Sequence, residues 1–380
     1  MNACSVVVVG AHPWSSEVTT DDLNLRPARA LAERLGGRYD VIVPSGGAPS
    51  GQATFGPVRL HRLQSPNRLA FLITARRKID ELVAPGGRSV LMSSEPLAAV
   101  AIEMSKARRR RPHLVHIQGE VLSPGPEYGS RFKRSSLSLA ARMAVRRASA
   151  VRVVSRKLER EVQALTSSPV VFLGSRVDTS RFQPATPPAP QTPLVEGVMV
   201  GSLLDVKNHD TAIRAWARVV EELPHAKLRI IGDGPRRSHV EALVDSLFLR
   251  EHVEFVGTVS HDRVPGLLTS ARCFIHPSWS EGQPRAVLEG MACGLPVICS
   301  DISAHREMVP DVGRLVPPDD VEGWTAALLE VLRDPSRSAD MGGRARSHIM
   351  KSYQFEANLD RYAELILAVA TGEYREVVRT

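Results

Sequence analysis

Two glutamates, Glu281 and Glu289, lie eight positions apart in the stretch SEGQPRAVLEGMACGLPV, residues 280–297. Pro284 suits the first turn of a helix, where a missing N–H costs nothing, and Gly294 suits the position just past the end of one. A helix over about 284–293 is therefore expected. Glu281 then lies on the loop before this helix, and Glu289 lies more than one turn inside it.

The start of this helix is a potential anion site. A loop that runs from a strand, here CFIHPS at 273–278, into a helix presents free N–H groups to an anion. A carboxylate accepts hydrogen bonds from paired hydroxyl groups. The two glutamates would therefore suit a ligand with hydroxyls on both sides of its phosphates, such as a nucleotide-sugar. The spacing alone fits two solvated helix glutamates better.

Three more glycine turns follow strand-like runs in the same half of the chain, and they shift the balance towards a ligand site. They lie in VGSLLDVKNHD (200–210), IIGDGP (230–235) and FVGTVS (255–260). Lys207 would stand just before a helix, where it offers a point charge to phosphate, with Asp210 as the expected N-cap. Because the carboxyl ends of parallel strands share one edge, the four loops should converge on the edge of a cleft.

The elements that must position these residues alternate along the chain. In the first half the expected strands are 5–10, 39–45, 89–94, 113–119 and 150–155, and the expected helices are 25–37, 67–83, 96–110, 136–148 and 156–165. Strands that alternate with helices in this way predict a parallel sheet with helices on both faces.

A proline-rich stretch, 184–193, interrupts the alternation, which restarts after it. Its prolines exclude a helix or a central strand, so it is expected to be a linker. The sequence therefore predicts an α/β protein with two Rossmann-like, doubly wound parallel-sheet domains, 1–183 and 194–355, that face an interdomain cleft. The last segment, 356–380, is expected to be a helix that returns to the N-terminal domain.

Composition limits the class of protein. Hydrophobic content of 43% is ordinary for a globular chain, and no run approaches the roughly 18 apolar residues of a membrane span. The opening MNACSVVVVG lacks the basic region of a signal peptide, which favours a cytoplasmic protein. The four cysteines show no paired spacing, so reduced core residues are expected rather than a metal site.

The two halves of the chain differ in charge. Residues 1–190 hold 28 Lys and Arg against 14 Asp and Glu, whereas residues 191–380 hold 21 against 27. The basic helix expected near 130–148 could dock a peripheral protein on the anionic inner face of a membrane. A solvated arginine-rich face explains the same pattern. Aromatic content is only 5%, without a stacking platform, so nucleic acid is not an expected partner.

The second half resembles the retaining glycosyltransferases of family 4, which have the GT-B fold. Glu281 and Glu289 match that family's E-x7-E signature, and the likeness covers most of residues 194–330. The segment LGSRVDTSRFQP (173–184) is similar to the family's segment before the interdomain linker. The first half matches mainly in the order of strands and helices. The matching segments of the second half are VGSLLDVKNHDTAIRAW, LRIIGDGP, VEFVGTVS and HPSWSEGQPRAVLEGMACGLPVICSD.

The resemblance implies roles for individual residues. Glu289 would bind the ribose hydroxyls, and Glu281 would hold the donor sugar with the backbone of Gly282 and Gln283. Lys207 would neutralise the diphosphate leaving group, the step that needs fixed positive charge. The family generally works without a metal on the donor, so neither metal nor cofactor is expected. The other implied donor-side positions are Gly201, Ser202, Gly257, Val259, Pro284 and Arg285.

The chain departs from the family pattern on both sides of the expected cleft. Ser202 stands where the family usually has an arginine, and Arg285 or Arg306 is the candidate substitute for its charge. The family's first glycine-rich loop is also missing. His12 stands in its place, either as a residue that touches donor or acceptor or as a plain loop histidine.

The third departure concerns a family histidine near the donor sugar, which is Gln118 in this chain. A glutamine still hydrogen-bonds a sugar hydroxyl but carries no positive charge. His116 lies two residues earlier, as either a catalytic or a core histidine, and Glu120 lies nearby on the acceptor side.

Together these features predict a retaining hexosyltransferase that uses a UDP- or GDP-linked sugar in envelope or exopolysaccharide assembly, with a glycan or glycolipid acceptor. The leaving phosphate itself would take the acceptor proton. Transfer to a small soluble polyol, such as an inositol or an aminocyclitol, is the close alternative. A nucleotide-sugar epimerase and a catalytically silent nucleotide-sugar-binding protein are the rivals from other classes.

Overall fold

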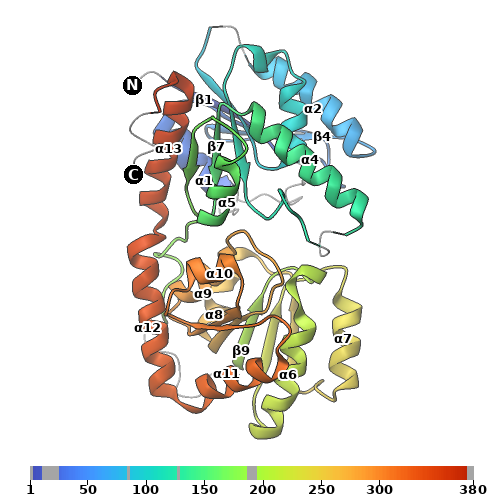
Figure 1. Ribbon diagram of the computed structural model, residues 1–380, viewed down its shortest axis with the longest axis vertical. Helices are drawn as coiled ribbons and strands as arrows, with labels where there is room; N and C mark the ends of the chain where they lie inside the picture. Colours follow the sequence, from blue (N-terminus) through green and yellow to red (C-terminus); the bar gives the residue numbers. More distant parts are fainter. Residues whose placement is uncertain (1–2, 11–24, 84–85, 126–128, 186–194, 375–380) are drawn as a thin grey trace. The chain divides into compact units, whose positions relative to one another are not determined.

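The computed structural model describes residues 3–10, 25–83, 86–125, 129–185 and 195–374. The chain forms two compact units. Unit 1 is Met1–Gly174 with Glu356–Thr380, and unit 2 is Ser175–Phe355. Each unit is built around a sheet of its own, which confirms the predicted α/β class with two parallel-sheet domains (Figure 1).

Unit 1 contains an eight-stranded sheet in the order β3-β4-β2-β1-β5-β6-β7-β8. All neighbouring strands are parallel except β3 and β4. The central strands are rich in Val, Ile and Leu because helices cover both faces of a parallel sheet. The strands are β1 Ser5–Val9, β2 Tyr39–Pro44, β3 Gly51–Phe55, β4 Val58–Leu63, β5 Ser89–Ser93, β6 His113–Ile117, β7 Ala150–Val153 and β8 Val170–Phe172.

The helices of unit 1 include one layer in which α3 packs against both α2 and α4 (Figure 1). The C-terminal helix α13 also belongs to unit 1, where the hydroxyl of Tyr362 lies 2.6 Å from Nε2 of His116 on β6. The helices are α1 Leu25–Leu35, α2 Arg68–Leu82, α3 Pro96–Glu103, α4 Arg131–Arg147, α5 Arg156–Gln163 and α13 Phe355–Thr371.

Unit 2 contains a six-stranded parallel sheet in the order β11-β10-β9-β12-β13-β14. Successive residues of a strand join two different apolar clusters, as Ile230 and Ile231 do, so the sheet is buried on both faces. The strands are β9 Val195–Val200, β10 Leu228–Ile231, β11 Val253–Gly257, β12 Ala271–His276, β13 Val297–Ser300 and β14 Arg314–Val316. The helices are α6 His209–Glu222, α7 Arg237–Ser246, α8 Val264–Thr269, α9 Arg285–Ala292, α10 Ser303–Met308, α11 Val321–Arg333 and α12 Pro335–Ser352.

The boundary between the units differs from the expected one. Residues 175–183 belong to unit 2 rather than to the N-terminal domain. The N–H of Val177 donates to the carbonyl of Tyr353 at 3.0 Å, and Phe182 is buried in the same apolar cluster as Phe274. The segment expected to be a linker lies outside the described residues from 186 onward.

Several element limits also differ from the periodic pattern, because local hydrogen bonds decide where a helix begins. α4 begins at Arg131 rather than 136, since the side chain of Ser130 accepts from the N–H of Lys133 and caps the helix. The helix expected over 96–110 ends at Glu103 and is followed by a separate 3₁₀ turn, Ala107–Arg109. The sequence patterns do not reveal β3, β4, β8 and β14, which are short strands at or beside a sheet edge.

Two adjacent glycines of α12 should respond in opposite ways to alanine. A Cβ on Gly342 would lie 2.0 Å from the carbonyl oxygen of Gly294, just past α9, whereas a Cβ on Gly343 meets nothing within 4 Å. Gly342→Ala should lower the free energy of unfolding by about 1–3 kcal/mol, because backbone must move to make room. Gly343→Ala should raise it by about 0.5–1 kcal/mol. Urea unfolding compares the two, and effects of the same sign would contradict this packing.

Candidate active site

Three glycine loops interlock at the carboxyl edge of the unit 2 sheet. The N–H of Gly201 donates to the carbonyl of Ile231 at 3.0 Å, and the N–H of Gly232 donates to that of Gly257 at 2.9 Å. Gly232 has a φ of +131°, and a Cβ there would lie 2.0 Å from the carbonyl oxygen of Gly201. Glycine alone allows this approach. The loops after β9, β10 and β11 therefore form one continuous wall.

Asn208 fixes the turn that presents Lys207. It lies in the left-handed region, at φ 50° and ψ 46°, which asparagine tolerates better than most residues. Its side chain donates to the carbonyls of Pro277 at 3.1 Å and Pro318 at 2.7 Å, and it accepts from the hydroxyl of Thr211 at 3.0 Å. The loop after β9 is thus tied to the loops that follow β12 and β14.

The prediction that Asp210 is the N-cap of a helix is wrong. α6 begins at His209 with Asn208 in the cap position, so Asp210 lies inside the first turn. There its carboxylate accepts from Arg236 at 3.2 Å. Asp320 caps a helix, since its side chain accepts from the N–H of Gly323 at the start of α11.

Glu281 is the centre of a hydrogen-bonded cluster on the loop after β12. Its Oε1 accepts from Nζ of Lys207 at 2.5 Å, from the hydroxyl of Ser278 at 2.7 Å and from Nε2 of His276 at 2.9 Å. The side chains of Glu281 and Lys207 are only 12% and 21% exposed. Shielding from water strengthens contacts between such charges. The first glutamate of the signature and the expected phosphate-side lysine are therefore in direct contact.

The cluster has a defined protonation state near neutral pH. Burial alone would raise the pKa of Glu281, but the hydrogen bond of His276 and the charge of Lys207 hold it well below its usual range. Burial lowers the pKa of His276, against the opposing effect of Glu281. His276 is thus a neutral imidazole that donates from Nε2, and Glu281 is a carboxylate balanced by Lys207. The carboxylate of Glu281 thus sets the direction of the Lys207 side chain.

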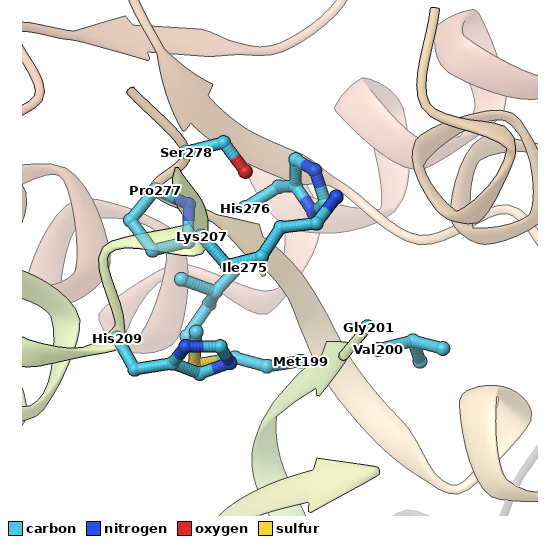
Figure 2. Close-up of a pocket in the computed structure, with 9 residues that line it drawn as sticks. All are labelled: Met199, Val200, Gly201, Lys207, His209, Ile275, His276, Pro277 and Ser278. Carbon is cyan, nitrogen blue, oxygen red and sulfur yellow. The ribbon is translucent and has the colours of Figure 1, made fainter. Parts of the chain in front are cut away.

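A small pocket lies beside this cluster, between the ends of β9 and β12 (Figure 2). The side chain of Lys207 extends towards His276, and His209 forms another part of the lining (Figure 2). Burial, assisted by the charge of Lys207, lowers the pKa of His209 to about 4. The imidazoles of the lining are therefore neutral near pH 7, and Lys207 supplies positive charge to the pocket.

Glu289 connects α9 to the turn after β11. Its side chain is largely buried, and its carboxylate lies 3.0 Å from Nε2 of His261. The ring of His261 packs on Phe182, with 5.1 Å between the ring centroids, and its Nδ1 is buried without a hydrogen-bond partner among the described residues. The second glutamate of the signature thus adjoins the turn at Gly257, which takes a φ of +76°. Val259 of this turn packs on an apolar cluster.

The loop between the two glutamates is anchored inside unit 2. Gly282 and Gln283 are buried. The side-chain oxygen of Gln283 accepts from the backbone N–H of Ser175, and its carbonyl accepts from the Ser175 hydroxyl at 3.2 Å. Pro284 is the N-cap of α9 rather than its first residue, and Gly294 follows the helix with a φ of +77°, as expected for its end.

The two candidate substitutes for the family arginine differ in their surroundings. Ser202, which replaces it, is exposed. Arg306 is held in a two-point ion pair with Asp301, at 2.5 and 2.9 Å. Arg285 is exposed at the start of α9 and forms no ion pair with any described residue. Arg285 is thus the better placed of the two to serve as a second cation.

Unit 1 holds the other candidates from the sequence. Gln118 is exposed, one residue past the end of β6. His116 is buried and bonded to α13, so we assign it to packing rather than to chemistry. Glu120 forms an ion pair with Lys157. His12 lies outside the described residues.

Sequence reasoning missed the histidines that surround the two glutamates. His276 is the last residue of β12, and a polar residue at the carboxyl end of a buried parallel strand was the available signal. Behind it, His305 donates from Nδ1 to the carbonyl of Ser300 at 2.8 Å and packs edge-on against His276, with 5.4 Å between centroids. Burial lowers the pKa of His305 to about 3, so it adds no charge at neutral pH.

The described part of the chain contains neither the geometry of a metal site nor a membrane-spanning helix. No group of three or more His, Cys, Asp and Glu side chains there is arranged to hold a metal ion. The four cysteines are unpaired and buried. Within the described ranges, no helix has both the length and the apolar character that a membrane span requires.

The arrangement of the strands and helices is that of the GT-B glycosyltransferases. Sucrose-phosphate synthase from Thermosynechococcus elongatus superposes with a TM-score of 0.81 over 97% of this chain and 99% of that one, at 18% identity. HepE from Anabaena, solved with UDP-glucose, superposes with a TM-score of 0.73 over 96% and 99%, also at 18% identity. At such identities these likenesses show the fold alone.

Two family models match the chain over its two halves. Residues 25–173 match the glycosyl transferase 4-like domain, and residues 190–348 match glycosyl transferases group 1. Together with the GT-B fold and the E-x7-E signature at Glu281 and Glu289, these matches show that the chain belongs to glycosyltransferase family 4. The resemblance drawn from the sequence is confirmed.

Relatives of the chain are named for lipid, glycan and polysaccharide synthesis. A GDP-mannose-dependent monoacylated alpha-(1-6)-phosphatidylinositol monomannoside mannosyltransferase of Corynebacterium glutamicum is 30% identical over 55% of this chain and 59% of its own length. The putative colanic acid biosynthesis glycosyltransferase WcaL of Salmonella typhimurium is 28% identical over 66% and 61%. The N-acetyl-alpha-D-glucosaminyl L-malate synthase of Bacillus anthracis is 29% identical over 43% and 43%. The chain thus spans about half the length of these relatives.

Proposed function

We propose that this glycosyltransferase moves a hexose-type sugar from a UDP- or GDP-linked donor to an acceptor hydroxyl, with retention at the anomeric carbon. The contact between Lys207 and Glu281 beside the pocket carries the proposal. A diphosphate at Lys207 would have its sugar within reach of the Glu281 carboxylate. No metal ion is needed in this arrangement, because lysine supplies the charge.

The other end of the donor fits the wall formed by the glycine loops. Glu289 would accept hydrogen bonds from the ribose hydroxyls, with His261 as its neighbour at 3.0 Å. The base would then lie at the turn that contains Gly257 and Val259. Exposed N–H groups at the start of α9, with Arg285, would face the phosphates.

The proposed chemistry depends on the departure of the diphosphate. The bond between the anomeric carbon and the phosphate oxygen breaks while the acceptor oxygen bonds to the same face of the sugar. Lys207 would stabilise the charge that develops on the leaving oxygen. That oxygen then takes the acceptor proton, so no strong protein base is required. His276 and Ser278 would keep Glu281 in place during the reaction.

We place the acceptor in envelope or exopolysaccharide assembly at the cytoplasmic side of a membrane, with Gln118 and Glu120 on the acceptor side. Two relatives named for phosphatidylinositol mannoside and colanic acid synthesis support this choice. A small soluble acceptor is the second candidate, because another relative is named an N-acetyl-alpha-D-glucosaminyl L-malate synthase.

Thermal unfolding with UDP, GDP, ADP and TDP, each with and without magnesium, tests the donor site. A ligand that binds only the folded protein at about 100 times its Kd stabilises it by roughly 2.7 kcal/mol. One diphosphate should therefore raise the midpoint without metal. Glu289→Ala should lose this response, whereas Glu322→Ala, at a side chain that is 84% exposed on α11, should keep it.

The outcome also separates the rival functions. If none of the diphosphates raises the midpoint, the donor site proposed here is wrong. If one does, NMR of a reaction with that nucleotide-sugar shows whether the product is a new α- or β-glycoside, an epimerised donor, or nothing. An inverted glycoside would contradict retention, an epimerised donor would favour the epimerase, and an unchanged donor would favour the silent binding protein.

A further inference from the structure

The helix layer α2–α3–α4 of unit 1 exposes large apolar side chains. Phe132 and Leu139 of α4 are 84% and 71% exposed, and Leu69 and Ile73 of α2 are 69% and 41% exposed. Phe132 and Leu139 are two helical turns apart, and Leu69 and Ile73 are one turn apart, so each pair lies along one side of its helix. Apolar side chains gathered on one layer mark an interaction surface.

The same layer is strongly basic. Residues 68–83, 96–111 and 130–148 hold 15 Lys and Arg against three Asp and Glu. Two of these acids already have basic partners, since Glu81 pairs with Lys78 at 3.0 Å and Glu103 with Arg108 at 2.9 Å. α4 itself contains no acidic residue. The positive charge of the layer is therefore largely uncompensated within it.

The exposed apolar side chains adjoin the proposed acceptor side. α2 and α4 each follow a parallel strand, so their first turns, with Leu69 and Phe132, lie at the carboxyl edge of the unit 1 sheet. The loop that begins with Gln118 lies against α4, because the hydroxyl of Ser138 donates to the carbonyl of Leu122 at 2.6 Å. A partner held on α4 would therefore be next to this loop.

We propose that the α2–α3–α4 layer docks on an anionic lipid bilayer, with Phe132 and Leu139 inserted at the headgroup boundary and the arginines of α4 on lipid phosphates. The proposal rests on the proposed function in one respect, that the acceptor is lipid-linked. A bilayer matches the apolar and the basic character of the layer at once. A second copy of the chain would bring the same positive charge against it, which costs free energy.

Sedimentation of the full chain with lipid vesicles tests this surface. Vesicles of equal parts phosphatidylglycerol and phosphatidylcholine are compared with vesicles of phosphatidylcholine alone, each at low and high salt. The chain should bind the anionic vesicles at least about tenfold more tightly, and salt should weaken this binding. Phe132→Ser with Leu139→Ser should lower the affinity by about tenfold or more, because two exposed apolar side chains no longer enter the lipid.

A matched control removes exposed aromatic surface elsewhere. Phe248 of unit 2 is 91% exposed at a φ of 57°, which asparagine tolerates, so Phe248→Asn should bind vesicles like the unchanged chain. Unchanged binding by the double variant, or no preference for anionic lipid, would overturn the proposal. Self-association that the same double variant abolishes would also overturn it, in favour of a second copy on this face.

The nucleotide response separates this proposal from the proposed function. The double variant should show the same thermal response to the bound diphosphate as the unchanged chain, which also shows that it is folded. Vesicle binding without any diphosphate response would sink the transferase proposal and leave the docking surface intact. A diphosphate response without vesicle binding would contradict the docking surface and leave the transferase proposal intact.

Discussion

Lys207→Met should lower kcat by about 10²–10³-fold while the protein stays folded. Methionine keeps an unbranched chain of similar length but removes the charge that Nζ places 2.5 Å from Glu281. The oxygen of the departing diphosphate then develops negative charge without a cation beside it. Initial rates with the donor identified by thermal unfolding measure the effect.

Two variants control for charge and for position. Lys207→Arg keeps the positive charge and should retain more activity than Lys207→Met. Lys227 lies just before β10, at the end of the sheet opposite the glycine loops, and its Nζ donates to the carbonyl of Glu251. Lys227→Met should therefore leave kcat unchanged. A Lys207→Met enzyme with normal kcat would remove this lysine from the proposed chemistry.

Glu281→Gln should lower kcat by about 10²-fold or more, with a smaller effect on donor binding. Its carboxylate orients three donors at once, from Lys207, Ser278 and His276. An amide carries no charge to balance Lys207, and misplacement of a catalytic group by about 1 Å is enough for a loss of this size. Glu289→Gln is the comparison, because loss of a ribose contact should raise KM more than it lowers kcat. The reverse pattern would exchange the roles assigned to the two glutamates.

Glu281→Gln should also change how the free energy of unfolding depends on pH. The folded-state pKa of Glu281 lies below its ordinary value, since His276 and Lys207 outweigh the effect of burial. Its contribution to stability is therefore present above the unfolded pKa of about 4.3 and is lost as pH falls from there towards the folded pKa. Urea unfolding should show Glu281→Gln to be less stable than the unchanged chain at pH 7, by an amount that shrinks below about pH 4. A constant difference at all pH values would contradict this account.

The donor side of the site could be predicted from sequence because its signals are local. A proline before α9 and a glycine after it fix the helix, and they place Glu281 on the loop and Glu289 inside. Glycines after three strands predicted that the loops after β9, β10 and β11 converge, since parallel strands end at a shared edge. These features need only neighbouring residues and the rules of parallel sheets.

The histidines and the partners of the candidate residues could not be predicted in the same way, because they depend on contacts between distant segments. His261 meets Glu289 across 28 positions, and Lys207 meets Glu281 across 74. His116 shows the converse case, since the sequence left open whether it is a catalytic or a core histidine. Its partner Tyr362, 246 positions away, places it in the packing of α13.

That last contact has a consequence for the order in which the protein can be completed during synthesis. Unit 1 is assembled from residues 1–174 and the helix that begins at 355, so all of unit 2 leaves the ribosome before unit 1 has its last part. The ring of α13's Tyr362 lies 5.1 Å from the guanidinium of buried Arg152, which donates to the carbonyls of Leu173 and Gly174. During synthesis, the imidazole of His116 and the guanidinium of Arg152 lack their contact with Tyr362 until α13 has been made. About 180 further residues must be added before then, at roughly 5–20 residues per second. Unit 2, which is continuous in sequence, can therefore complete its fold before unit 1 does.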